Sequence, residues 1–109
     1  MLIATRVLKL RRSSGDIDVP VRIYAPEQRE VDWVCRLEVD WPDGVLEIPV
    51  GGIDAVQALN LALQLAGAQI YASAHHAAGA LTWLEPGKGY GVPITYNLRD
   101  LLVGDDKKL

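Results

Sequence analysis

The stretch PVGGIDAVQALNLALQLAGAQIYASA, from Pro49 to Ala74, decides the fold because it predicts the one long helix of the chain. Asp54 precedes the periodic apolar run and Gln57 follows three residues later, which is the pattern of a capping box. An acidic cap competes with phosphate for the free amides at a helix start, and no phosphate-loop motif accompanies Gly51-Gly52. We therefore predict a strand-to-helix turn at these glycines and a helix over 54–74.

The predicted helix carries no charge, since no Asp, Glu, Lys or Arg occurs from Ala55 to Leu84. Its pattern nevertheless argues against a membrane span, because amide side chains interrupt the run and alanine dominates where leucine would be expected. We predict instead a helix that covers the core of a globular domain, with no membrane partner. The interrupting amides are Gln57, Asn60, Gln64 and Gln69.

The apolar surface of this helix is wider than one sheet face requires. At about 100° per residue, apolar side chains cover well over half the circumference, whereas a helix on a sheet needs little more than about 100°. The surplus is a second apolar flank, which we define by Leu61, Leu65 and Ala68. Three explanations remain open: Trp83 and Tyr90 of the C-terminal segment pack on this flank, a second copy of the chain covers it, or a different protein does.

Residues 1–50 alternate between apolar and polar types with period two, which predicts β-strands with one buried and one exposed face. The turn signals SSGD and WPDGV each join the two strands of a hairpin, and the polar linker PEQREV (26–31) connects the two hairpins. We predict a single α+β domain over 1–109, with an antiparallel sheet of about four strands covered on one face by the helix. The expected strands are LIATRVLKLRR, IDVPVRIYA, DWVCRLEVDW and VLEIPV.

The C-terminal part has weaker patterns. Residues 77–104 are rich in glycine and proline, which predicts a loop-rich cover. Within them, ALTWL (80–84) could add a short fifth strand. Residues 105–109 are mostly charged, and we expect them to form a frayed tail.

Composition limits the class of protein. The 109 residues include 11 basic and 14 acidic side chains, a formal net charge of −3, which argues against nucleic acid as a partner. The early basic residues Arg6, Lys9, Arg11 and Arg12 have the spacing of a strand's outer face and its end. A single cysteine, Cys35, suits a reducing compartment, and no secretory signal order is visible. We therefore expect a cytoplasmic protein.

No set of residues points to catalysis, a metal or a cofactor. His75 and His76 are adjacent and point about 100° apart on a helix, so they chelate poorly. Cys35 is in phase with the buried face of its strand, where thiols are inert. A polar ligand remains an alternative, with Arg22 and Arg36 on the exposed sheet face, or Lys88 and Tyr90 in the glycine-rich loop EPGKGYGVP, as the binding residues.

A wider pattern covers most of the chain. It consists of a Trp-x-Cys strand at Trp33 and Cys35, a Gly-x-Asp-x-x-Gln-Ala-Leu helix start over 52–59, and a late Gly-x-Pro at Gly91 and Pro93. In this pattern the chain resembles an uncharacterised family of small bacterial domains. The resemblance implies an α+β domain of unknown function and carries over no catalytic residue and no ligand.

Two hypotheses about function follow. The first is a non-enzymatic protein-interaction domain, self-associating as a homodimer or acting like an immunity or accessory protein, with Leu61, Leu65 and Ala68 in the interface. The second is a small-molecule binder or small enzyme that uses the polar sheet face or the glycine-rich loop. The first is favoured because the chain lacks a metal set, a nucleophile–base pair and a cofactor motif, and because the helix has a second apolar flank.

Overall fold

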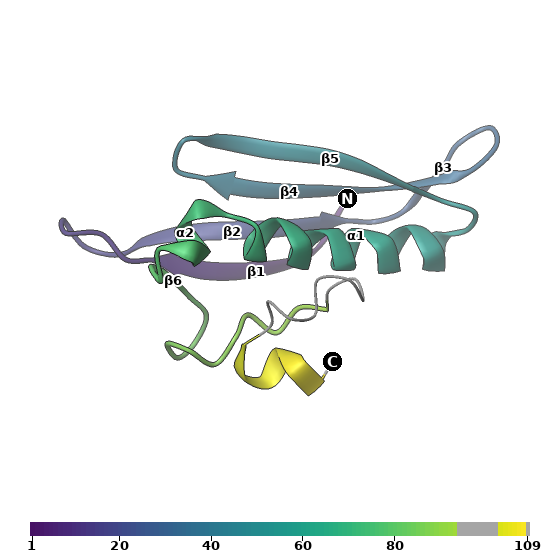
Figure 1. Ribbon diagram of the computed structural model, residues 1–109. Coiled ribbons are helices and arrows are strands. Elements are labelled where there is room, and N and C mark those ends of the chain that lie inside the picture. The colour runs from purple at the N-terminus through teal and green to yellow at the C-terminus, as the bar shows by residue number, and fades with distance from the viewer. Residues whose placement is uncertain (94–102, 109) are drawn as a thin grey trace.

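A computed structural model describes residues 1–93 and 103–108 of the chain. It shows an antiparallel sheet with one main helix lying along one face (Figure 1). The α+β class is thereby confirmed. The elements are β1 (Leu2–Leu10), β2 (Ile17–Tyr24), β3 (Glu27–Gln28), β4 (Trp33–Trp41), β5 (Gly44–Gly52), α1 (Ala55–Tyr71), α2 (Ala74–Ala77), β6 (Leu81–Thr82) and a 3₁₀ helix, η2 (Gly104–Lys108).

The sheet contains the two predicted hairpins and two short additions. Its order within the described residues is β3-β4-β2-β1-β6, with β5 on β4. The sheet therefore has more strands than the predicted four. β6 pairs with the end of β1, inside the stretch that suggested a fifth strand, whereas the two-residue β3 lay in the segment expected to be a polar linker.

Alternation decides which side of the sheet is buried. Cys35, Leu37 and Val39 of β4 are fully buried, and they pair across the ladder with half-buried apolar residues of β5. The same period places Arg6 on the buried face, in phase with Leu8 of β1. The prediction that Arg6 belongs to the outer face was therefore wrong.

The helix start agrees with the predicted N-cap at Asp54, but the Gln57 side chain reaches the Ile53 amide and not the Asp54 amide that a capping box requires. The Asp54 carboxylate accepts a hydrogen bond from the Gln57 amide at 2.8 Å, and the Gln57 side chain accepts one from the Ile53 amide at 2.7 Å. The predicted end at Ala74 was wrong, because α1 ends at Tyr71. The reason is Ser73, whose side chain caps a separate short helix, α2, by accepting from the His76 amide.

Helix α1 has two unlike flanks beside its buried stripe. It packs against β4 and β5 and only marginally against β2. On the side away from β5, the backbone of Pro93 lies against Gly67, where any Cβ would collide with the Pro93 carbonyl oxygen. The segment after β6 thus approaches this flank more closely than any residue larger than glycine would allow (Figure 1).

The chain end differs from the expected frayed tail. Residues Gly104–Lys108 form η2, and Asp106 within it is 1% exposed. Specific hydrogen bonds, described below, hold this turn on the body of the domain. In the described part of the chain, no helix is long and apolar enough to cross a membrane.

Candidate functional site

The described residues offer two candidate sites, one on each flank of α1. The first is built around Asp106, the buried charged side chain of η2. Its carboxylate accepts hydrogen bonds from the Tyr71 hydroxyl at 2.6 Å, the Tyr90 amide at 2.7 Å and the Gly91 amide at 2.6 Å. Because three donors satisfy the carboxylate, its burial does not leave an unpaired acceptor. We call these three donors and their carboxylate the Asp106 clasp.

Arg6 completes the clasp from the sheet. Its guanidinium donates to the Tyr90 carbonyl at 2.5 Å and to the Gly91 carbonyl at 3.1 Å, and it lies 3.7 Å over the Trp83 ring. Burial lowers the pKa of Arg6, and the nearby negative charge of Asp106 opposes that shift. A cation and an anion therefore hold the same two residues of the loop, one by their carbonyls and the other by their amides.

The two tyrosines link the clasp to α2. The Tyr90 hydroxyl donates to the Leu81 carbonyl at 3.2 Å and lies 2.5 Å from His76 Nδ1. The Tyr90 hydroxyl has a single proton. When it donates this proton to Leu81, Nδ1 of His76 must be the donor in the contact between His76 and Tyr90. Burial raises the pKa of Tyr90 to about 12 and also raises that of Tyr71, while burial lowers the pKa of His76. Both tyrosine hydroxyls are therefore neutral near neutral pH.

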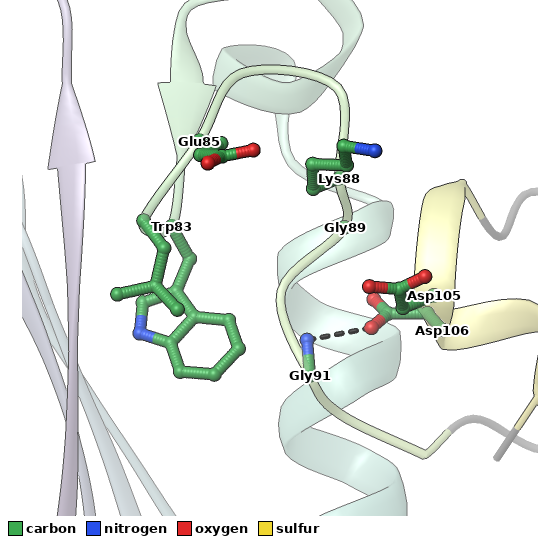
Figure 2. A pocket seen from close by; sticks show the side chains of 8 residues that line it. Trp83, Glu85, Lys88, Gly89, Gly91, Asp105 and Asp106 are labelled. Atoms are coloured by element: carbon green, nitrogen blue, oxygen red, sulfur yellow. Dashed lines mark hydrogen bonds between the residues drawn. The ribbon is translucent and has the colours of Figure 1, made fainter.

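A pocket of about 340 Å³ opens beside the clasp. Figure 2 shows the loop rising from Trp83 past Glu85 and returning through Lys88 and Gly89, with Asp106 beside the returning limb. Carboxylates outnumber the single ammonium group among its walls. Its lining comprises Trp83, Leu84, Glu85, Lys88, Gly89, Gly91, Asp105 and Asp106.

A strained turn at residues 83–85 forms part of the wall of this pocket. The Glu85 amide donates to the Trp83 carbonyl at 2.7 Å, and Leu84 between them has φ +62°. This three-residue hydrogen bond around a left-handed residue is a γ-turn, a rare arrangement that costs on the order of 1–3 kcal/mol for a residue other than glycine. The Leu84 side chain is 82% exposed, so packing of that side chain does not explain the strain.

The four residues predicted to bind a ligand do not meet. Arg22 and Arg36 lie on the uncovered face of the sheet, whereas Lys88 and Tyr90 lie in the layer that covers the other face. Tyr90 is 4% exposed and belongs to the clasp, so Lys88 alone among the four lines the pocket beside it.

The two sheet arginines already have partners. Arg22 is 3.9 Å from Glu38 and 3.5 Å from Asp40, and Arg36 is 3.9 Å from Glu47 and 4.1 Å over the Tyr24 ring. Tyr24 in turn donates to Glu38. Cross-strand pairs of this kind are typical of a solvated sheet face.

The second site is a shallow apolar groove between α1 and β5, lined by Val50, Leu61, Gln64, Leu65 and Ala68, with a volume of about 280 Å³. All three residues of the second apolar flank lie in this α1–β5 groove. Leu61 is 38% exposed. The groove runs beside β5, which pairs with β4 on one side and with no described residue on the other.

Trp83 and Tyr90 do not cover this groove. Trp83 stacks on Arg6, and Tyr90 packs edge-on against Tyr71 and His76. The described part of the C-terminal segment therefore covers the opposite flank of α1, the one that carries Gly67.

Sequence reasoning missed Arg6 and Asp106. Arg6 could have been recognised, because it stands in phase with Leu8 and Leu10 on β1. Asp106 gave no such signal, since it sits in a charged segment and its partners lie 15 to 35 residues away in sequence. The glycines on both sides of Tyr90 were the remaining hint that the backbone there closely approaches another group.

The chain belongs to the family described as a domain of unknown function, DUF6968, which matches residues 4–94. This finding confirms the predicted membership of an uncharacterised domain family. Searches of curated proteins and of solved structures found no match. Arg6, Tyr71 and Tyr90 lie within the matched residues, whereas Asp106 lies beyond them.

Proposed function

We propose that this DUF6968 domain is a non-enzymatic protein-interaction domain that associates with a second copy of itself through the α1–β5 groove. The observation that carries the proposal is the half-exposed apolar lining of the groove, made by Leu61, Leu65 and Ala68 beside an open strand edge. Depletion of charge with apolar residues at the centre distinguishes interface cores from the rest of a protein surface.

The lack of charge on α1 favours a second copy as the partner. In a two-fold symmetric interface each residue near the axis meets its own counterpart, so a charged residue there would face a like charge. Helix α1 carries no acidic or basic residue over Ala55–Tyr71. Two such helices can pack against each other without electrostatic repulsion.

Strand β5 favours a dimer that packs side chains in the groove over one in which the sheets of the two copies pair edge to edge. Pro49, in the second half of the strand, has no N–H group to donate to an added strand. Proline on an edge strand is one of the ways by which proteins prevent edge-to-edge pairing. The proposed dimer therefore buries the side chains of α1 and β5 and does not extend the backbone ladder along all of β5.

Leu61→Asp tests this function with Val56→Asp as the matched control. Both residues are exposed apolar positions of α1, but Val56 is 75% exposed and lies outside the groove. Sedimentation velocity should show a dimer for the wild type and for Val56→Asp, and a folded monomer for Leu61→Asp. A wild-type chain that stays monomeric at high concentration would refute the proposal.

A small-molecule site is the second candidate, and the pocket of about 340 Å³ at Trp83 and Lys88 is the observation that favours it. Its aromatic wall and its charged rim are of the kind that ligand pockets use. A fragment screen by ligand-observed NMR should then find binders that Trp83→Ala no longer binds. No hits, or hits that bind both proteins equally, would remove this candidate.

We also propose a cytoplasmic location. It is supported by Cys35, a free and fully buried cysteine that forms no disulfide. Detection of the protein in a soluble cytoplasmic fraction, and not in an oxidising compartment, would test it.

A further inference from the structure

The Asp106 clasp has the composition of a carboxylate-binding site. Two consecutive backbone amides, those of Tyr90 and Gly91, and the Tyr71 hydroxyl all point at one carboxylate, at 2.6 to 2.7 Å. Hydrogen bonds to an ionised acceptor are short and strong, and backbone amides in series form concave anion sites. The guanidinium of Arg6 adds a positive charge beside the site.

The backbone around Tyr90 is shaped for this task. Gly89 and Gly91 have φ values of +89° and +67°, which direct the intervening amides to one side of the chain. A Cβ at Gly89 would lie 2.7 Å from the Asp106 carboxyl carbon and 2.6 Å from the Val103 carbonyl oxygen. The loop therefore admits the bound group only because residue 89 has no side chain.

The receptor and its occupant lie in different parts of the chain. Arg6, Tyr71, Tyr90 and Gly91 all fall within the residues that match the family, whereas Asp106 falls outside them. The residues that match the family model thus contain the donors, and the carboxylate comes from a residue that follows the match. A covalently tethered group has an effective concentration in the millimolar range, which suffices to fill a modest site.

We infer that Tyr71, Tyr90, Gly91 and Arg6 form a receptor for a carboxylate ligand, and that Asp106 occupies it as a displaceable internal substitute. The planar carboxylate suits the site because one oxygen accepts from Gly91 and the other from Tyr71 and Tyr90. The ligand is either a small free acid or a carboxylate on a peptide, and the experiment below separates these sources.

The test is rescue of Asp106→Ala, made in the full chain, by added carboxylate. This variant leaves the three donors without an acceptor, so its melting temperature should fall by several degrees. Sodium acetate should then raise the melting temperature in a saturable manner in the millimolar range, whereas sodium chloride at equal ionic strength should not. Asp106→Asn is the matched control, because its amide group fills the same space as a weaker acceptor and should shift the rescue to higher acetate concentration.

A peptide with the sequence of residues 103–109 distinguishes the two sources. If acetate and the peptide both stabilise Asp106→Ala, but the peptide saturates at a concentration at least about tenfold lower, the receptor favours a peptide carboxylate. Equal affinity indicates a receptor for small acids. The inference is overturned if neither probe stabilises Asp106→Ala, or if chloride stabilises it as well as acetate does.

Folding failure of Asp106→Ala would not leave the inference untested. In that case the peptide is titrated into ¹⁵N-labelled Asp106→Asn, and the Tyr90 and Gly91 amide resonances are followed. Displacement of the weaker asparagine acceptor should shift both resonances toward their wild-type positions. No shift at millimolar peptide would overturn the inference.

Discussion

The two flanks of α1 show how differently one helix can be covered. On one side, Gly67 contacts the backbone of Pro93, and the Asp106 clasp closes over the end of the helix at Tyr71. On the other side, Leu61 and Leu65 line a groove that β5 covers only in part. The first flank is largely covered by chain segments that are held through hydrogen bonds, and a small pocket of about 120 Å³ remains between Leu63 and Val92. The second is apolar and open.

We expect the clasp side of α1 to matter mainly for the stability of the monomer and the groove side mainly for association. A buried carboxylate with three donors contributes to stability only while all of its partners remain in place, because each unpaired buried group is costly. An open apolar groove contributes nothing comparable to the monomer, but it gains when another surface covers it. We therefore expect substitutions on the clasp side to change the free energy of unfolding, and substitutions in the groove to change association.

The largest effect should come from Arg6→Met. Loss of the guanidinium leaves the Tyr90 and Gly91 carbonyls without their donor and Asp106 without its neighbouring positive charge. We expect the free energy of unfolding to fall by about 2–3 kcal/mol in urea titrations. The control is Lys9→Met, which removes only an exposed pair with Asp18 and should cost less than about 1 kcal/mol. Equal losses in the two variants would show that Arg6 has no special role.

Gly67→Ala should change the free energy of unfolding by less, and the sign of the change shows how tightly this flank of α1 is covered. In an unobstructed helix this substitution stabilises by about 1 kcal/mol. Here the new methyl group meets the Pro93 carbonyl oxygen at a cost of about 1–3 kcal/mol, so we expect a net loss of up to about 2 kcal/mol. A stabilised variant, measured by the same urea titration, would show that the segment around Pro93 yields easily and that this flank is not tightly closed.

The smallest of these effects should be the change in stability with pH. Burial lowers the pKa of His76 in the folded chain, so between the folded and unfolded pKa values the unfolded chain binds more protons. The resulting stability is fully present above the unfolded pKa of about 6.5 and is lost as the pH falls through the folded value. His76→Gln should reduce the fall in melting temperature that the wild type shows between about pH 7.5 and 5.5. His75→Gln leaves the contact between His76 and Tyr90 intact and is the control variant; if both variants flatten the pH dependence equally, His76 is not its source.

Local patterns predicted most of the fold. Alternation identified the buried faces of β2 and β4, and the predicted N-cap at Asp54 placed the start of α1. These features could be predicted because each depends on residues close in sequence. The end of α1 was missed because the cap at Ser73 was not recognised, and the extra strand β3 is only two residues long.

The sites were predictable to different degrees. The α1–β5 groove follows from the helical period alone, so Leu61, Leu65 and Ala68 were placed together correctly by angular spacing. The clasp joins β1, α1, the glycine-rich loop and η2, and no periodicity connects such distant segments. The alternative ligand-binding residues stay predictions: Arg22 and Arg36 lie on the exposed sheet face, as their alternation indicated, and Lys88 lines the pocket beside the clasp.

Sedimentation equilibrium of the wild-type chain over an approximately hundredfold range of concentration tests the central claim most directly. If the open flank of α1 is a self-association surface, the weight-average mass should rise from that of one chain, 11.9 kDa, toward twice that value. Leu61→Asp should remain at the mass of one chain throughout. A wild-type mass that stays at 11.9 kDa over the whole range would contradict the account.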